Sequence, residues 1–298
     1  MDYPISKTEY DHIRTLLYDE SGISLGDNKQ SLVVSRLSKR LRDLSLDSFE
    51  AYYEFVTGDT SGAEFTRMLD LLSTNKTDFF REPKHFEFLR DEILPSLERE
   101  KRIRIWSSAC STGEEPYTIA ITLREGVKNP AQWDFGILAS DISTRVLAHA
   151  SAGLYAQERI STVPTDVAQR HFLKGKGNNA GLVKVKPHLS DMIKFRHLNL
   201  MSEKFPIKSP LDLIFCRNVM IYFDRPTQER LVGKFFRYLK PGGYLFIGHS
   251  ESLQWLKHDF STIAPTMSPM RICAVASAQA TRVDQPSKIG PFGLPMIG

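Results

Sequence analysis

Ile103-Arg-Ile-Trp-Ser-Ser-Ala-Cys-Ser-Thr-Gly-Glu-Glu-Pro116 is the stretch of sequence that decides the fold. Its first residues predict a buried strand. The small residues from Ser108 to Gly113 predict a loop whose backbone approaches a ligand closely where the strand ends. Pro116 suits the first turn of a helix, and apolar residues at helical spacing continue from Tyr117 to Val127. Strand, loop and helix predict the first unit of a doubly wound α/β sheet.

The composition is that of a globular protein with a substantial core. The chain has 298 residues, 41% of them hydrophobic and 25% charged, and a formal net charge of +4. There is no charged region followed by an apolar run at the N-terminus, and no run of about 18 apolar residues, so we expect a cytoplasmic protein without membrane insertion. Three widely spaced cysteines predict neither a disulfide framework nor a zinc site, and no metal is expected. The mild basicity allows an acidic partner but falls short of a nucleic-acid signature.

Residues 1–75 predict an all-helical domain. Ser6 to Glu9 has the sequence of a capping box. In Lys29 to Leu44 the apolar residues fall on one arc of a helix and the basic residues on another. The basic arc consists of Lys29, Arg36, Lys39 and Arg40. A solvated face and a binding face are both compatible with this pattern.

A polar segment, Ser73 to Pro83, follows the helical domain and carries Asn75, Thr77 and Arg81. An ordinary turn and a linker that contributes to a site are both open from these residue types. We expect residues 76–100 to form this linker and a helix, and residues 101–276 to form the sheet domain. The Pro- and Gly-rich residues 277–298 are expected to be a disordered tail.

A second strand is predicted in Trp133 to Ser143, and Asp141 stands at its end. An acidic residue there faces the ligand crevice of a βαβ unit and can accept both hydroxyls of a ribose. The alternative is that Asp141 only caps the helix that follows. We favour the ribose role, because the small-residue loop precedes Asp141 at the interval that such units show.

The strand and helix alternation is interrupted at about residues 174–198. The glycine-rich segment Gly175 to Gly181 is followed by two short apolar runs, Leu182 to Val185 and Met192 to Phe195. Together they predict a small antiparallel β insertion that resembles a hairpin. It is too small for a core of its own, so it is expected to lie against the main sheet or to offer an edge to a partner peptide.

The absence of two nucleotide-binding motifs narrows the range of candidate ligands. The sequence has no Gly-x-Gly-x-x-Gly and no Gly-x-x-x-x-Gly-Lys-Ser/Thr, which disfavours dinucleotides and nucleotide hydrolysis. The segment His249-Ser250-Glu251 holds the residue types of a hydrolase triad, but such neighbours cannot point at one another at a strand end. A nucleoside site with a ribose-binding acid and no phosphate cradle describes an S-adenosylmethionine site.

Four segments carry a resemblance to a known family. They are Thr74-Asn-Lys-Thr-Asp-Phe-Phe-Arg-Glu82, Ser111-Thr-Gly-Glu-Glu-Pro-Tyr117, Phe215-Cys-Arg-Asn-Val-Met-Ile-Tyr-Phe-Asp224 and Gly248-His-Ser-Glu251. In this order they closely resemble the bacterial chemotaxis receptor glutamate methyltransferases, the CheR family, from about residue 8 to residue 276. The resemblance implies a Rossmann-like class I methyltransferase sheet. It also implies transfer of a methyl group from S-adenosylmethionine to receptor glutamates during sensory adaptation, leaving S-adenosylhomocysteine.

The resemblance also implies roles for individual residues. Arg81 and Tyr222 are the candidates nearest the transferred methyl group. The residues implied to line the cofactor pocket are Asn75, Thr77, Arg81, Glu115, Asp141, Asn199, Leu200, Asn218 and Val219. A glutamate is already an anion at neutral pH, so positioning rather than proton transfer is required. Arg81 would orient the substrate carboxylate, and Tyr222 would lie against the methyl or sulfonium group unless it is only a core aromatic.

The implied partner reopens the question of the basic helix. Because methylated receptor helices are rich in glutamate, the resemblance favours Arg36, Lys39 and Arg40 as substrate-binding residues that steer those helices. The insertion corresponds to a subdomain that holds a receptor's C-terminal tail in many family members. A nucleic-acid methyltransferase and a non-catalytic cofactor-sensing scaffold remain the alternatives. The first would want aromatics interleaved with basic residues, and the second would be expected to lack Arg81 or Asp141.

Overall fold

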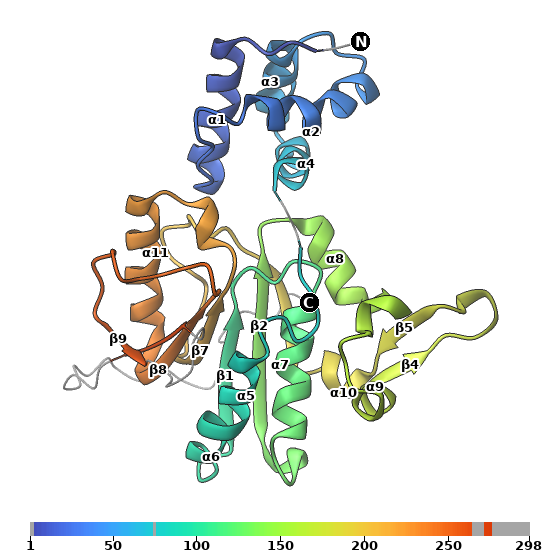
Figure 1. The fold of residues 1–298 in the computed structure, drawn as a ribbon, viewed down its shortest axis with the longest axis vertical. Helices are drawn as coiled ribbons and strands as arrows, with labels where there is room; N and C mark the ends of the chain where they lie inside the picture. Colours follow the sequence, from blue (N-terminus) through green and yellow to red (C-terminus); the bar gives the residue numbers. More distant parts are fainter. Residues whose placement is uncertain (1–2, 74–75, 264–270, 276–298) are drawn as a thin grey trace.

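The computed structural model describes residues 3–73, 76–263 and 271–275, which form a helical domain and a sheet domain (Figure 1). The predicted all-helical N-terminal domain is confirmed. Its helices are α1 (Lys7–Ser21), α2 (Gln30–Asp43), α3 (Phe49–Gly58) and α4 (Ala63–Leu72). The predicted capping box is present at α1, where Ser6 Oγ accepts from Glu9 N and the Glu9 carboxylate accepts from Ser6 N.

The apolar arc predicted for α2 forms part of the core of the helical domain. Val33, Leu37 and Leu41 are fully buried and pack with Ile13 and Leu17 of α1. These residues recur at helical spacing, so one stripe of each helix faces its neighbours. Burial of this stripe holds the domain together without any strand of its own.

Two residues of the basic arc of α2 make contacts inside the helical domain. Arg36 Nη1 donates to the carbonyls of Leu72 and Ser73 at 2.8 and 2.9 Å, which satisfies acceptors at the end of α4. Arg40 binds both carboxylate oxygens of Glu64, a buried side chain. Arg36 and Arg40 are half-buried and Lys39 is exposed. These contacts add a structural role, and the substrate-binding role of the three residues stays a prediction.

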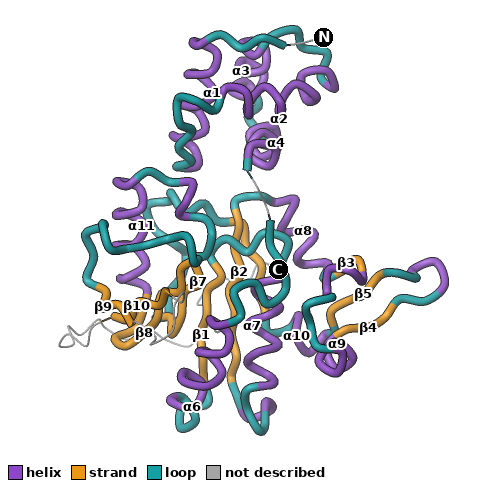
Figure 2. Tube along the Cα trace, in the orientation of Figure 1, coloured by secondary structure: helices purple, strands orange, loops and turns teal. Residues whose placement is uncertain are grey.

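A seven-stranded sheet organises the rest of the chain (Figure 2). Its strands are β1 (Arg102–Ser107), β2 (Asp134–Asp141), β6 (Ile193–His197), β7 (Leu211–Cys216), β8 (Leu239–Ile247), β9 (Phe260–Ile263) and β10 (Arg271–Val275). Their order is β6-β2-β1-β7-β8-β10-β9. The first five in this order are parallel, and β10 runs antiparallel between β8 and β9. The two strands predicted first, before and after the small-residue loop, are neighbours at the centre.

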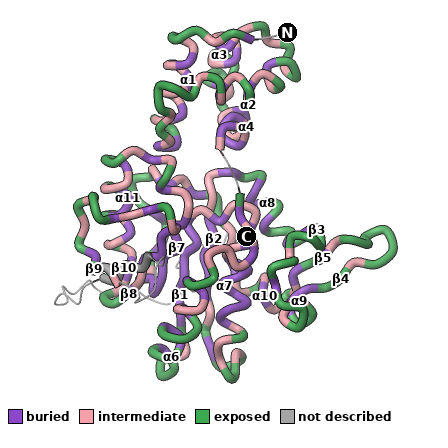
Figure 3. Tube along the Cα trace, viewed as in Figure 1, coloured by how far each residue is buried: buried purple, intermediate pink, exposed green. Residues whose placement is uncertain are grey.

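The strands β1, β2 and β7 are buried over most of their length (Figure 3). Alternate residues of each strand point to opposite sides, so Ile105 and Leu213 belong to one core cluster and Trp106 and Ile214 to the other. The first cluster includes residues of the helices before and after β1. In the second, the Trp106 ring meets Phe235 edge-on at 5.4 Å between centroids. A three-layer doubly wound domain results.

Helices flank the sheet between the strands. They are α5 (Lys84–Phe88), a π-helical turn η1 (Leu89–Ile93), α6 (Leu94–Ser96), α7 (Glu114–Glu125), η2 (Pro130–Gln132), α8 (Thr144–Ala152), η5 (Met220–Tyr222) and α11 (Arg225–Tyr238). Asp224 caps α11 by accepting from Thr227 N at 3.0 Å. The helix expected to run through residues 84–100 is interrupted by the π turn and ends earlier.

The β insertion exists, but the predicted bounds of 174–198 are wrong. Its sheet has the order β3-β5-β4, formed by β3 (Leu154–Ala156), β4 (Phe172–Lys174) and β5 (Leu182–Val185), and it projects beside α8 (Figure 1). Its connections are η3 (Gln157–Ile160), α9 (Thr165–His171) and η4 (Gly177–Asn179). The run Met192 to Phe195 belongs instead to β6, which pairs in parallel with β2. The short helix α10 (Pro187–Ser190) carries the chain from the insertion back to the main sheet, so β5 and β6 are not a hairpin.

The Arg40–Glu64 pair makes a prediction about stability. Arg40→Met leaves the Glu64 carboxylate buried without its cation, and we expect the free energy of unfolding to fall by about 2 kcal/mol. Lys39→Met, at the exposed neighbouring position, is the matched control and should change it by less than about 0.5 kcal/mol. Urea unfolding followed by circular dichroism measures both. Equal losses in the two variants would contradict the structural role assigned to Arg40.

Candidate active site at the carboxyl ends of the central strands

The strand order reverses at the centre of the sheet. From β1 the chain proceeds to β2 and β6 on one side and then returns to β7 on the other. In doubly wound sheets ligands bind outside the carboxyl ends of the strands at such a switch point. A pocket that opens to solvent lies there. Loops of the sheet, the linker and the helical domain all contribute to its walls.

The loop after β1 forms the floor of the pocket. Its backbone is tied to neighbouring strands, because Ser108 N donates to Phe215 O and Cys110 N donates to Ser140 O, both at 2.9 Å. Gly113 has φ +98°, and a Cβ there would lie 2.8 Å from the Tyr155 hydroxyl. Only glycine fits this turn into α7 without strain. The small residues of the opening stretch are therefore required both by packing and by access to the pocket.

Glu115, in the first turn of α7, is a largely buried carboxylate of this floor. Its Oε1 accepts from Ser107 Oγ at 2.7 Å, and its Oε2 accepts from Arg217 Nη1 at 3.2 Å. Burial raises the pKa of Glu115, and Arg217 and the Ser107 hydroxyl only partly oppose that effect. A cationic ligand group beside it would favour the ionised form. The adjacent Glu114 turns away from the pocket and pairs with Arg159 at 2.6 Å.

Asp141 stands at the end of β2, where it was predicted. Its Oδ2 accepts from Ser111 N at 2.9 Å and its Oδ1 from Ser143 N at 3.0 Å. Ser143, not Asp141, caps α8 through Val146 N. The alternative role of helix cap is therefore wrong. Burial raises the pKa of Asp141, although its backbone hydrogen bonds act in the opposite direction. Each oxygen keeps lone-pair capacity for a ligand hydroxyl.

The linker brings further predicted residues to the pocket. Thr77 and Arg81 line it, and Arg81 Nη1 donates to Lys76 O at 2.8 Å. Asn75, the other linker residue predicted to bind the cofactor, lies outside the described residues. The linker is fixed from both sides, because Phe80 N donates to Thr118 Oγ1 at 3.1 Å and Thr162 Oγ1 donates to Phe79 O at 2.9 Å. It is therefore a structural part of the pocket rather than an ordinary turn.

The remaining predicted residues come from the loops after β6 and β7. Asn199, Leu200, Asn218, Val219 and Tyr222 all line the pocket. The end of α1 reaches this wall, since Ser24 N donates to Tyr222 O at 2.8 Å and Asn199 Nδ2 donates to Glu20 O at 2.6 Å. The helical domain therefore closes one side of the site. Tyr222 is half-buried at the pocket, which disagrees with its being only a core aromatic.

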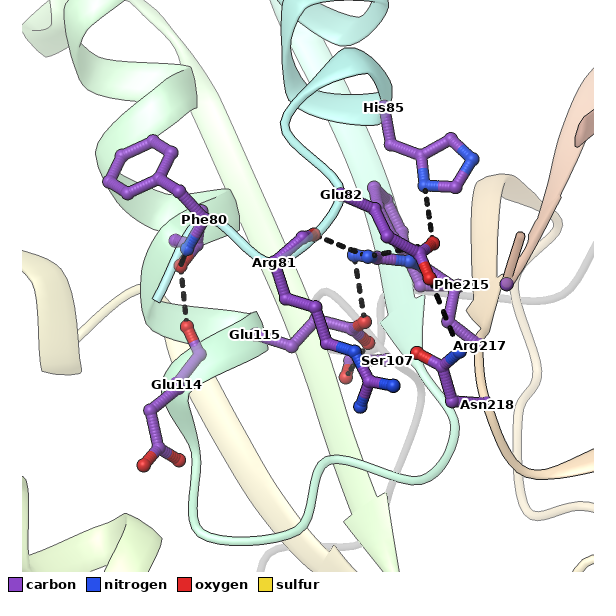
Figure 4. A network of polar contacts seen from close by, with 12 residues as sticks. Phe80, Arg81, Glu82, His85, Ser107, Glu114, Glu115, Phe215, Arg217 and Asn218 are labelled. Carbon is purple, nitrogen blue, oxygen red and sulfur yellow. Dashed lines mark hydrogen bonds and ion pairs between the residues drawn. The ribbon is translucent and has the colours of Figure 1, made fainter. Parts of the chain in front are cut away.

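Sequence reasoning missed the charged cluster beneath the linker (Figure 4). Arg217, whose side chain is only 2% exposed, lies between Glu82 and Glu115 at 3.1 and 3.2 Å. A signal existed, because Arg217 directly follows a strand without a single exposed residue and a buried cation requires partners. Asp70 of α4 was also missed. It lines the pocket and accepts from Arg145 Nε at 2.7 Å.

The hydrolase-type segment after β8 has a purely structural arrangement. The Glu251 carboxylate accepts from the backbone amides of Gly248, Asn218 and Ile221 at 2.6, 2.9 and 3.3 Å. It therefore fixes the loop after β7, while Ser250 is exposed. This arrangement confirms that the three residues are not a triad.

Comparison with known proteins assigns the family. Residues 75–268 match the family model "CheR methyltransferase, SAM binding domain", and residues 8–73 match "CheR methyltransferase, all-alpha domain". The chain belongs to the CheR methyltransferase family. It is thus an S-adenosylmethionine-dependent methyltransferase, and the parallel sheet with one inserted antiparallel strand is its class I methyltransferase core.

Curated relatives cover most of the chain. The chemotaxis protein methyltransferase of Klebsiella aerogenes is 42% identical over 257 residues, which is 86% of this chain and 87% of that protein. That of Salmonella typhimurium is 40% identical over 264 residues, with 88% and 90% covered. Chemotaxis protein methyltransferase 2 of Pseudomonas aeruginosa is 42% identical over 269 residues, with 89% and 94% covered. The similarity therefore spans both domains.

The pocket residues fit S-adenosylmethionine. Two half-buried carboxylates that line the pocket, Glu115 and Asp141, suit the ammonium group and the ribose hydroxyls of this molecule. Leu200 adds an apolar surface for a heterocycle.

Among the described residues, no helix is long and apolar enough to cross a membrane.

The raised pKa values make a prediction about cofactor affinity. A carboxyl whose pKa is raised takes up its proton at a higher pH than usual, and protonation removes the charge and acceptors that the ligand needs. We expect the affinity for S-adenosylhomocysteine to fall as the pH is lowered from neutral, with the fall beginning above the pH range in which an ordinary carboxyl titrates. Asp141→Asn should weaken binding about tenfold to a hundredfold at neutral pH.

Isothermal titration calorimetry measures both effects. Asp191→Asn, at an exposed site, is the matched control and should bind like the wild type. Unchanged affinity in Asp141→Asn would remove Asp141 from the site. A pH-independent affinity in the wild type would show that neither carboxylate titrates in this range.

Proposed function

We propose that this chain transfers a methyl group from S-adenosylmethionine to glutamate side chains of chemotaxis-type receptors and forms glutamate methyl esters. The observation that carries the proposal is the pocket itself, in which Arg81 and Tyr222 line the same cavity as the two carboxylates that suit the cofactor. The names of the relatives, chemotaxis protein methyltransferases, support receptors of this class as substrates.

The reaction requires little acid–base chemistry from the protein. A substrate glutamate is ionised at neutral pH, so its oxygen is already a nucleophile. The cofactor supplies a methyl group on a sulfonium sulfur, which departs as a thioether when the carboxylate oxygen takes the methyl. The protein has to hold the two partners in line, and such positioning contributes several kcal/mol to lowering the barrier, about 7 or more at best.

Arg81 is suited to orient the incoming carboxylate. Its guanidinium presents planar donors that match a carboxylate, and the bond from Nη1 to Lys76 O holds the group at the pocket wall. Tyr222 is suited to the methyl side of the reaction, because the face of an aromatic ring attracts a cationic group. The backbone of Tyr222 is held by Ser24 N and Val219 O, so its loop is anchored.

The insertion is our candidate for a second receptor contact. β4 lies at the edge of the small sheet, and Leu173 on it is 50% exposed. An edge strand can accept an extended peptide by strand addition. The adjoining loop is tightly folded, because a Cβ on Gly175 would fall 2.0 Å from Asn179 O. We propose that a receptor tail peptide pairs with this edge.

The methylation proposal is tested with a receptor cytoplasmic fragment and methyl-labelled cofactor. Alkali should release the label as methanol, because carboxyl methyl esters hydrolyse whereas N-methyl groups persist. Arg81→Ala should lower the rate of label transfer by about 100-fold or more through loss of substrate orientation. Arg225→Ala, on the exposed start of α11, is a control that should retain the wild-type rate. Alkali-stable label, or an unaffected Arg81→Ala, would contradict the proposal.

The tail proposal has a separate test. Titration of a receptor C-terminal peptide should show binding that Leu173→Asp weakens at least about tenfold, because the apolar contact at the edge is lost. The affinity for S-adenosylhomocysteine should not change in that variant. Equal peptide binding by the wild type and Leu173→Asp would place the tail elsewhere.

A further inference from the structure

The backbone around Arg81 has an unusual conformation. Both neighbours of this residue are non-glycine residues in the left-handed region, Phe80 at φ 55° and Glu82 at φ 58°. L-residues adopt this region at a cost, so such a conformation persists only where surrounding contacts impose it. The direction of the Arg81 side chain therefore depends on the contacts that hold residues 80–82 in this conformation.

Arg217 makes the contacts that hold this segment from the sheet side. Its Nη2 donates to the backbone carbonyl of Arg81 and lies 3.1 Å from Glu82 Oε2. Its Nη1 reaches Glu115 Oε2 at 3.2 Å, and its guanidinium carbon lies 5.3 Å from the centre of the Phe86 ring. One planar group thus joins the linker, the helix after β1 and the loop after β7 (Figure 4).

We call this arrangement, in which Arg217 and Glu82 join the linker to the loop after β7, the bracket. The other oxygen of Glu82 adds two contacts to it. Glu82 Oε1 accepts from Asn218 Nδ2 and from His249 N, both at 3.2 Å. Asn218 itself has φ 57°, so a third non-glycine residue with left-handed backbone directly follows Arg217, in a second segment. The two strained segments therefore hold each other through Glu82 and Arg217.

The charges favour a bracket over a cation site. The side-chain ligand atoms of Glu82, His85 and His249 lie within 4.8 Å of one another, but Glu82 Oε2 is also bonded to the Arg217 guanidinium. A metal ion there would face that positive charge. Burial, and then Arg217, lower the pKa of His85 to about 3, so this ring is neutral. Burial alone would raise the pKa of Glu82, but Arg217 and the hydrogen bonds hold it below its ordinary value.

We propose that Arg217 is a positioning residue for methyl transfer, which fixes residues 80–82 through the Arg81 carbonyl and Glu82 and so places the Arg81 side chain in the pocket. The proposal rests on the role of Arg81 in the proposed function. Arg217 acts through the linker and needs no contact with the methyl group.

Arg217→Lys is the first test variant. Lysine keeps the charge but cannot bridge the carbonyl and both carboxylates with one planar group. We expect amide hydrogen exchange in residues 76–86 of the cofactor-free protein to accelerate at least tenfold, with the other described segments unchanged. Glu82→Gln, which removes the anion at nearly equal volume, should accelerate the same segment. Arg237→Lys, on the exposed face of α11, should exchange like the wild type.

A double-mutant cycle separates positioning from a general structural loss. Arg217→Lys should lower methyl transfer at least tenfold in the wild-type background and less than twofold when Arg81 is already alanine, because the two act as one unit. Equal losses in both backgrounds, or exchange that accelerates throughout the sheet domain, would overturn the proposal.

The test of Arg217 can be distinguished from the test of the proposed function. Hydrogen exchange and titration of S-adenosylhomocysteine need no receptor. If wild-type protein leaves the receptor fragment unlabelled, the receptor methylation proposal fails while the exchange result still decides the bracket. If labelling occurs and exchange in residues 76–86 does not respond to Arg217→Lys, the bracket fails and the function stands.

Discussion

The guanidinium of Arg217, buried between Glu82 and Glu115, is the interaction on which the site depends. It links the linker, the loop after β7 and the first turn of α7, three segments that are far apart in the sequence. A buried cation of this kind is costly unless its donors are satisfied, and here two carboxylates and a backbone carbonyl satisfy Nη1 and Nη2, while the buried Nε has no partner among the described residues. These contacts hold the linker in a conformation with left-handed backbone at two non-glycine residues, which local preferences alone would not select.

The carboxylates of the pocket suit a ligand that carries a cationic group. Arg217 is shared by Glu82 and Glu115, and Asp141 accepts from the backbone amides of Ser111 and Ser143. Burial raises the pKa of Glu115 and Asp141, so the ligand-free site opposes their ionisation. A molecule that carries an ammonium group, a sulfonium and a pair of hydroxyls compensates both effects. The helical domain contributes by closing the wall near Tyr222 through Ser24.

Much of the fold and the site could be predicted from the sequence, for physical reasons that particular residues illustrate. The strand before the small-residue loop and Asp141 at the next strand end depend on local signals that this fold class repeats. The predicted bounds of the insertion were wrong because a short apolar run such as Met192 to Phe195 is typical both of a hairpin strand and of a parallel strand at the edge of a sheet. Arg36 and Arg40 resembled a solvated basic face, and only the structure reveals their partners on α4. The Arg217 cluster depends on contacts more than 100 residues apart, which no local pattern encodes.

One measurement tests the account most directly, the crystal structure of the chain with S-adenosylhomocysteine. The account predicts the ribose hydroxyls on Asp141, the ammonium group beside Glu115 and the sulfur between Arg81 and Tyr222, with Arg217 still bonded to the Arg81 carbonyl. A ligand whose sulfur lies away from Arg81 and Tyr222, or a linker released from Arg217 in the complex, would contradict it.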